Sequence, residues 1–507
     1  MPSIARTFAI LSTWCLLWGI PTTQASPGKP GTLDPSWATL SLPGPGKVIT
    51  PIGASQDIAN ALALQADGKV VVAGSCYNGA DYDFCALRYN ANGTLDAKFN
   101  GGGTVMTGVG MNNDYANAVA VQADGKIVLA GGCNNGTKDG FCALRFNSNG
   151  TLDTSFNATG KIITNIGLGN DAATAIAVQP DGKLVLAGYC LNGTTNDFCA
   201  LRYYADGTLD TSLNGTGKII TSVGQGDDIP YAITLQADGK LVLAGVCVGD
   251  NRFCAVRYNG NGSLDTGFSG TGKVISAGTP GDFVRGGSAA LVLQPDGKLV
   301  IAGTCAGSRL GDFCAVRHNA DGTLDTGFGN SGSISAGLAP KSVARGLALQ
   351  VDGALVLAGF CDVVITGSKS YVCVVRYSSG GVRDTAFGSA GVVTTTIGTG
   401  NNVANAIIVQ PDGKLLVAGY CDSGTNYDFC AVRYDGGPFG YQNCKPDLDG
   451  DGAFLATTDA LINMRIALGI TGPAVVGGIT FAPNATRNTW LLIRDYLITQ
   501  CGLSLVQ

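Results

Sequence analysis

The stretch ALALQADGKVVVAG, residues 61–74, decides how this sequence folds. Near copies of it begin six further units, and successive turn aspartates are separated by 57, 57, 57, 58, 56 and 60 residues. The seven turn aspartates are Asp67, Asp124, Asp181, Asp238, Asp296, Asp352 and Asp412. Self-similarity at a fixed period of this length is typical of a repeat architecture.

Each unit predicts four short strands. In the first unit, apolar residues alternate in ALALQ and again in KVVVAGSC, and the Ala-Asp-Gly between them is typical of a tight hairpin. A third strand, FCALRYN, leads into a fourth segment that begins with Thr-Leu-Asp. Four antiparallel strands in each of seven units predict an all-β fold, a seven-bladed β-propeller. The main alternative is a solenoid, which would need polar capping repeats at both ends.

The heptapeptide GTLDPSW, residues 31–37, looks like the start of a fourth segment, although no repeat precedes it. The last unit stops at AVRYDGGPFG, residues 431–440, without a fourth segment of its own. We therefore expect residues 31–50 to supply the missing strand of the seventh blade and to close the ring. Asp34 would then face Arg433.

An arginine recurs at one position of the third strand, and an aspartate follows it eight residues later, across the turn. This spacing predicts a cross-strand ion pair in each unit. The expected pairs are Arg88–Asp96, Arg145–Asp153, Arg202–Asp210, Arg257–Asp265, Arg317–Asp325 and Arg376–Asp384. His318 replaces the tyrosine that follows this arginine in one unit, so we expect it to be structural.

These residues resemble a known family. The words QPDGKLVLAG (179–188), FCALRY (198–203) and GTLDTSF (150–156) are similar to the delta-60 repeat, a bacterial β-propeller repeat. The resemblance covers residues 31–436. It implies a propeller and little about activity, and the two cysteines in each unit depart from the common pattern.

Each unit carries two cysteines that bracket the loop between its second and third strands. Their even number and the expected export favour disulfides, whereas two thiolates without a nearby histidine make a poor zinc site. The expected pairs are Cys76–Cys85, Cys133–Cys142, Cys190–Cys199, Cys247–Cys254, Cys305–Cys314, Cys361–Cys373 and Cys421–Cys430, together with Cys444–Cys501 around the C-terminal module.

Residues 1–25 have the basic start, apolar run and small-residue end of a secretory signal peptide, with an uncleaved membrane anchor as the alternative. We therefore expect a monomeric protein that is secreted, periplasmic or on the cell surface. A net charge of −5 gives no case for nucleic acid as a partner. One histidine in 507 residues removes most acid–base mechanisms at neutral pH.

After a propeller over residues 26–436 and a Gly-rich linker over 437–443, the sequence changes character at residues 444–507. Aspartates at alternate positions, followed by Gly452, match the first half of a calcium loop. The segment resembles half of a dockerin, an EF-hand-like module, with a mainly helical fold. The resemblance implies one Ca²⁺ held by Asp447, Asp449, Asp451, the carbonyl of Ala453 and, one residue late, Asp459. The alternative is an Asp-rich turn that caps a helix.

The loops between the cysteines and between the blades vary, while the Asp-Gly-Lys turns on the opposite face are nearly constant. Variable loops on a constant scaffold favour a binding face. Its amide, carboxylate and phenol groups suit sugars or peptides, and they include Tyr77, Tyr82, Asp83, Asp114, Asp171, Asp228 and Tyr427. The sequence thus favours a non-catalytic scaffold for an unidentified protein, glycan or cell-surface ligand. The alternative is a polysaccharide hydrolase or lyase that uses loop carboxylates near the channel.

Overall fold

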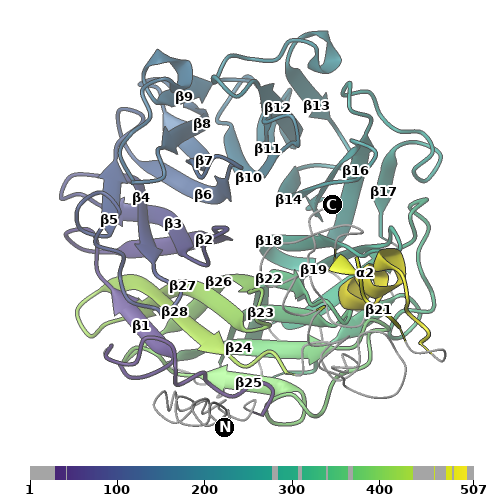
Figure 1. The fold of residues 1–507 in the computed structure, drawn as a ribbon. Helices are drawn as coiled ribbons and strands as arrows, with labels where there is room; N and C mark the ends of the chain where they lie inside the picture. Colours follow the sequence, from purple (N-terminus) through teal and green to yellow (C-terminus); the bar gives the residue numbers. More distant parts are fainter. Residues whose placement is uncertain are drawn as a thin grey trace, which may run out of the picture.

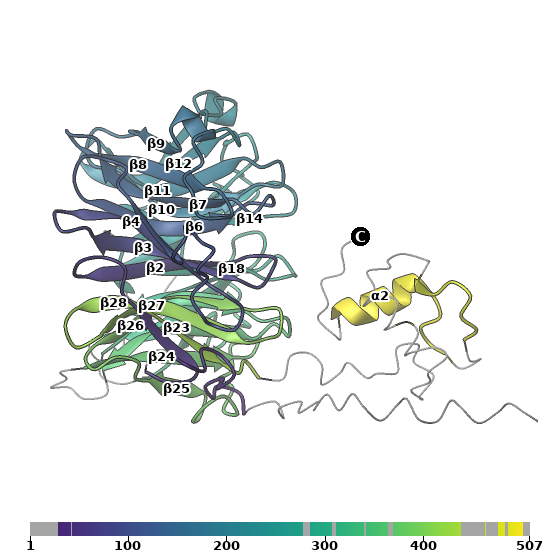
Figure 2. The same ribbon diagram turned by 60° about the vertical axis from the view of Figure 1, so that its left-hand side comes forward.

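The computed structural model describes residues 29–41, 43–276, 284–306, 311–338, 341–362, 369–437, 462, 475–481 and 485–499. Seven four-stranded antiparallel sheets surround a central axis, which confirms the seven-bladed propeller (Figure 1). Seen from the side, neighbouring blades follow one another as layers around the ring (Figure 2). No helix in the described part of the chain is long and apolar enough to cross a bilayer.

In six blades the strands run outward from the axis in chain order, and in the seventh the outermost strand is β1. The innermost strands are β2 (Asp57–Leu64), β6 (Asp114–Val121), β10 (Ala172–Val178), β14 (Asp228–Leu235), β18 (Val284–Leu293), β22 (Lys341–Leu349) and β26 (Asn402–Val409). The second strands are β3 (Val70–Tyr77), β7 (Ile127–Asn134), β11 (Leu184–Asn192), β15 (Leu241–Cys247), β19 (Leu299–Cys305), β23 (Leu355–Asp362) and β27 (Leu415–Asp422). Blades 1 to 7 are numbered below in this order.

The third strands are β4 (Tyr82–Tyr89), β8 (Asp139–Phe146), β12 (Thr195–Tyr203), β16 (Arg252–Tyr258), β20 (Asp312–His318), β24 (Ser370–Tyr377) and β28 (Tyr427–Tyr434). The outermost strands are β5 (Thr104–Thr107), β9 (Lys161–Thr164), β13 (Lys218–Thr221), β17 (Lys273–Ile275), β21 (Ser333–Ser335), β25 (Val392–Thr395) and β1 (Lys47–Thr50). Two 3₁₀ turns, η1 (Phe156–Ala158) and η2 (Leu213–Gly215), precede β9 and β13.

The N-terminal segment closes the ring, as the sequence predicts. Strand β1 pairs with β28 in antiparallel register, so the two ends of the propeller share blade 7 (Figure 1). The Nη2 atom of Arg433 lies 2.6 Å from Oδ2 of Asp34, and both side chains are buried. The pairing that distinguishes a closed ring from a solenoid is therefore present.

The six ion pairs expected within blades 1 to 6 are also present. In blade 2, Nε of Arg145 lies 2.7 Å from Oδ2 of Asp153, and its guanidinium stacks 4.5 Å from the ring centre of Phe156. Nη1 of the same arginine donates to the carbonyl of Ala205 in the next blade. We call this set of contacts the outer clasp, because it ties the turn of one blade to the turn of its neighbour.

A second recurring contact joins the outer strand of one blade to the third strand of the next. The hydroxyls of Tyr89 and Thr50 lie 2.8 Å apart, and in blade 5 Nε2 of His318 lies 2.9 Å from Oγ of Ser276. His318 is buried, and burial lowers its pKa. The only histidine thus occupies a structural position, as expected.

All seven disulfides expected within the blades are formed. The two cysteines are not directly opposite each other: Cys76 lies opposite Asp83, and Cys85 lies opposite Gly74. Each bond therefore crosses the hairpin diagonally. Only glycine fits at position 74, because a Cβ there would come within 1.9 Å of the carbonyl oxygen of Ile58.

The expected calcium ligands and the pair Cys444–Cys501 lie outside the described residues, as does the signal peptide. Of the C-terminal segment the structure describes residue 462, residues 475–481 and residues 485–499, which include helix α2 (Trp490–Thr499). The calcium site and the dockerin-like module therefore stay predictions.

Candidate functional site in the axial channel

Each innermost strand departs from regular pairing at one place. In β2 the register with β3 shifts between Ala59 and Ala61, so Asn60 is the extra residue of a β-bulge. Bulges re-aim side chains, and here the extra residue faces the propeller axis. The bulge residues are Asn60, Asn117, Thr174, Tyr231, Arg345 and Asn405. Together with Tyr189 and Ala289 they line one cavity of about 460 Å³.

Three of these positions hold asparagine, and the asparagines link neighbouring innermost strands. The Nδ2 atom of Asn60 donates to the carbonyl of Ala116 at 2.9 Å, and Asn117 makes the equivalent bond one blade further on. Asn405 donates to Ala59 at 2.6 Å, across the junction of blades 7 and 1. Thr174 keeps this link with its hydroxyl, at 2.5 Å from the carbonyl of Pro230. Asparagine at this position therefore has a structural role.

Arg345 departs from that pattern. Its Nη1 donates to Oδ1 of Asn405 at 2.5 Å, and its guanidinium lies 5.3 Å from the ring centre of Phe360. Among the described residues no carboxylate forms a salt bridge with it, whereas every outer-clasp arginine has one. A guanidinium that faces a cavity without a carboxylate partner can receive an anionic group of a ligand.

Two tyrosines supply the aromatic part of the cavity. Burial raises the pKa of Tyr231 to about 12. Burial also raises the pKa of Tyr189, and the nearby charges of Asp139 and Asp171 raise it further. Both phenols are therefore neutral at physiological pH and offer hydroxyl groups and ring faces to a ligand.

The sequence pattern predicts binding residues in the variable loops, but none of the seven loop residues named above lines this cavity. The tyrosines instead pack against one another: the rings of Tyr77 and Tyr82 lie 5.5 Å apart, and those of Tyr82 and Tyr115 lie 5.9 Å apart. Tyr427 packs against Tyr420 at 5.2 Å. These rings form small aromatic groups on blades 1, 2 and 7.

Three of the aspartates expected as exposed contacts are buried instead: Asp114, Asp171 and Asp228. Oδ2 of Asp114 accepts hydrogen bonds from the backbone of Val109 and Gly110, at 2.6 and 2.8 Å. The expectation was wrong, because a carboxylate at the start of the strand can fold back on free N–H groups four and five residues before it in the loop.

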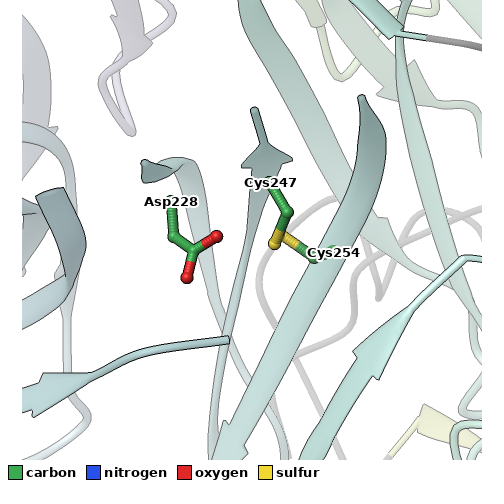
Figure 3. Close-up of side chains that lie close together, drawn as sticks. All are labelled: Asp228, Cys247 and Cys254. Carbon is green, nitrogen blue, oxygen red and sulfur yellow. A yellow bond between two sulfur atoms is a disulfide. The ribbon is translucent and has the colours of Figure 1, made fainter. Parts of the chain in front are cut away.

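One side-chain group in the described residues has the composition of a metal site: Asp228 with Cys247 and Cys254 (Figure 3). The two sulfur atoms are joined in a disulfide. Sulfur binds metal ions as a thiolate, so this group is not a thiolate metal centre.

The comparisons with known proteins agree with the fold. Six segments match the model of a family described as "Domain of unknown function (DUF5122) beta-propeller": residues 65–99, 122–156, 179–213, 236–268, 294–328 and 410–436. No protein of curated function matches the sequence.

Solved structures similar to this chain include several enzymes. One is a streptogramin B lyase, at 11% identity over 76% of this chain and 97% of that one, with a TM-score of 0.46. Another is a PL25 ulvan lyase bound to a saccharide, at 11% identity over 75% and 93%, with a TM-score of 0.44. A third is a fungal alcohol oxidase in complex with copper, at 13% identity over 76% and 75%, with a TM-score of 0.42. Likeness at this level carries no information on function.

Proposed function

We propose that the protein is an exported, non-catalytic propeller that binds an acidic oligosaccharide in its axial channel. Arg345 carries this proposal: it is a cation at the cavity wall, at a repeat position that asparagine occupies in three other blades. Like the asparagines, Arg345 reaches the next innermost strand, through Asn405, but it also brings a positive charge to the cavity wall.

The rest of the lining fits such a ligand. Asparagine and threonine side chains can bind sugar hydroxyls, while the phenol rings of Tyr189 and Tyr231 can lie against sugar faces. A cavity of about 460 Å³ lies within the usual range for small-molecule sites.

The alternative, a polysaccharide hydrolase or lyase, needs a general base beside the substrate. None of the described residues that line the cavity is Asp or Glu. The titratable hydroxyls there belong to Tyr189 and Tyr231, and a raised pKa is the opposite of what a base at neutral pH requires. These observations favour binding over catalysis.

Export and a calcium-binding C-terminal module complete the proposal. Seven buried disulfides suit an oxidising compartment, in line with a signal peptide at residues 1–25. For the dockerin-like module we retain one Ca²⁺ at Asp447, Asp449, Asp451, Ala453 and Asp459. Calcium titration of the full chain with and without Asp449→Ala tests that site.

The test of the channel is an array of oligosaccharides with and without uronic acid or sulfate groups. We expect the wild-type chain to retain acidic members, and Arg345→Gln to weaken that binding about tenfold to a hundredfold, as for a lost charge-assisted hydrogen bond. Arg252→Gln is the matched control, because Arg252 begins β16 and does not line the cavity. Equal losses in both variants, or retention of neutral sugars alone, would contradict the proposal.

A further inference from the structure

The innermost strands of blades 2, 4 and 7 each begin with a side chain that accepts hydrogen bonds from the loop leading into the blade. Oδ2 of Asp228 accepts hydrogen bonds from the backbone N–H groups of Val223 and Gly224, at 2.6 and 2.9 Å. Oδ1 of Asn402 accepts from Ile397 and Gly398 at 2.9 and 2.6 Å. One oxygen of each side chain therefore closes the loop that enters the blade.

The second terminal atom distinguishes the aspartates from the asparagine. Nδ2 of Asn402 donates to the carbonyls of Ser370 and Gly400, at 3.2 and 2.8 Å. Oδ1 of Asp228 is buried and has no hydrogen-bond partner among the described residues. The amide at Asn402 supplies hydrogens to carbonyl oxygens, whereas a carboxylate at the same place supplies only another oxygen.

The surroundings of the two positions correspond residue by residue. The backbone N–H of Ser370 donates to Oδ1 of Asn401 at 3.0 Å, and that of Asn196 donates to Oδ1 of Asp227 at 2.8 Å. Asn196 and Gly226 are thus the blade 3–4 counterparts of Ser370 and Gly400. Their carbonyl groups belong to the same end of the interface as Oδ1 of Asp228.

A second buried carboxylate, Asp197 of blade 3, lies close enough for its charge to act on Asp228. Asp197 is 1% exposed; its Oδ2 accepts from Asn192 at 2.7 Å, and its Oδ1 has no partner among the described residues. At the interface of blades 6 and 7 the counterpart of Asp197 is Tyr371, two residues before the second cysteine. At the interface of blades 6 and 7 both carboxylates are therefore absent and Asn402 supplies hydrogens, whereas at the interface of blades 3 and 4 both carboxylates are present.

The same rule holds around the ring. Two further interfaces pair aspartates at these positions, and each has a buried oxygen without a partner, on Asp428 or on Asp114. Asp171 lacks a paired aspartate, since Gly140 stands at the counterpart position, and its Oδ1 accepts from Leu191 at 3.3 Å. Apart from Oδ2 of Asp34, which is ion-paired with Arg433, the buried aspartate oxygens without a hydrogen-bond partner in the described residues all belong to these paired aspartates.

We propose that each paired-aspartate interface of the propeller binds a calcium ion between neighbouring blades. The three pairs are Asp197–Asp228, Asp83–Asp114 and Asp428–Asp57. Carboxylate and carbonyl oxygens are the ligands that Ca²⁺ prefers, and a divalent ion balances two buried carboxylates. Burial, and then the charges of Asp197 and Asp250, raise the pKa of Asp228. A bound cation would offset this burial cost and this repulsion between carboxylates. These sites are separate from the one expected at residues 447–459.

The experiment uses the full chain carrying Asp449→Ala, so that the proposed C-terminal site is absent. Calcium titration by calorimetry and thermal unfolding with calcium or with EDTA are measured. We expect calcium to raise the Tm, and Asp228→Asn to lower the number of bound ions by one. That variant should fold, because Asn402 already shows asparagine in this position.

Asp171→Asn is the matched control and should leave the number of bound ions unchanged. Equal Tm in calcium and EDTA for the parent chain, or an unchanged stoichiometry in Asp228→Asn, would overturn the proposal. So would a parent Tm that ignores calcium and falls with rising pH, because Asp228 would then hold a proton in place of the ion.

Discussion

The outer clasp and the axial channel are each formed by residues that recur at one position of every repeat. The residue types at the clasp position are constant among the blades, whereas those at the channel position differ. The arginine of the clasp is present in all seven blades, and in each blade it forms an ion pair with its aspartate. The channel position instead holds asparagine, threonine, tyrosine and arginine in different blades. A contact that stabilises every blade requires the same residue types in each blade. A surface that binds one ligand has no such requirement, so its residues can differ from blade to blade.

The difference between clasp and channel can be seen by comparing the contacts of Arg145 with those of Arg345. Arg145 is 4% exposed and bonded to a carboxylate, an aromatic ring and the next blade. Arg345 is half-buried and contacts one amide and one ring. The same side chain should therefore contribute to stability in one place and to binding in the other.

The largest effect should follow removal of residues 29–50. This deletion takes away strand β1, the buried Trp37 and the partner of Arg433. Loss of a buried tryptophan side chain costs ~3–5 kcal/mol, and an orphaned buried ion-pair partner costs a similar amount. We expect a strongly lowered Tm in calorimetry, partly restored by adding the 29–50 peptide. An unchanged melting curve would refute ring closure.

Arg145→Leu should destabilise the chain by ~3 kcal/mol, because it removes the buried guanidinium beside Asp153 and leaves Lys126, 3.0 Å away, as the remaining cationic partner. Although burial raises it, hydrogen bonds from Ser155 and Lys126 and the charge of Arg145 hold the pKa of Asp153 below its ordinary value. Urea unfolding measures the loss. Arg345→Leu is the comparison, with a cost below ~1 kcal/mol. Equal costs would remove the distinction between clasp and channel.

The clasp could be predicted from the sequence and the channel could not, for a physical reason. Arg88 and Asp96 are eight residues apart across one turn, so their contact depends only on local hairpin geometry. Asn60 faces the axis because a bulge between Ala59 and Ala61 breaks the alternation on which strand prediction relies. A polar residue recurring between two small ones was the available signal. The pairing of Asp197 with Asp228 depends on blade-to-blade packing, which no single repeat contains.

Removing one disulfide should have an intermediate effect. The double variant Cys190→Ser, Cys199→Ser opens a short loop between β11 and β12. In the chain-entropy account, a loop of this length contributes ~2–3 kcal/mol. Urea unfolding should show a lower midpoint with oligosaccharide binding retained. Loss of binding at full stability would mean that the hairpin loops, rather than the channel, form the site.

The smallest effect concerns His318, which occupies in blade 5 the position that Tyr258 occupies in blade 4. The histidine is neutral in the folded chain because burial lowers its pKa, whereas in the unfolded chain it titrates near its ordinary value. Below pH ~6.5 the unfolded state binds the extra proton, so stability falls as pH falls, by up to ~1.4 kcal/mol per pH unit. We expect His318→Tyr, which restores the residue of blade 4, to remove this component from denaturation curves between pH 7 and 5. Tyr258→His should install it, since the hydroxyl of Tyr258 contacts Thr221 at 2.8 Å as His318 contacts Ser276. If the stability of both variants depends on pH with the wild-type slope, another group is responsible for the acid sensitivity. The contact of His318 with Ser276 would then tolerate a protonated imidazole.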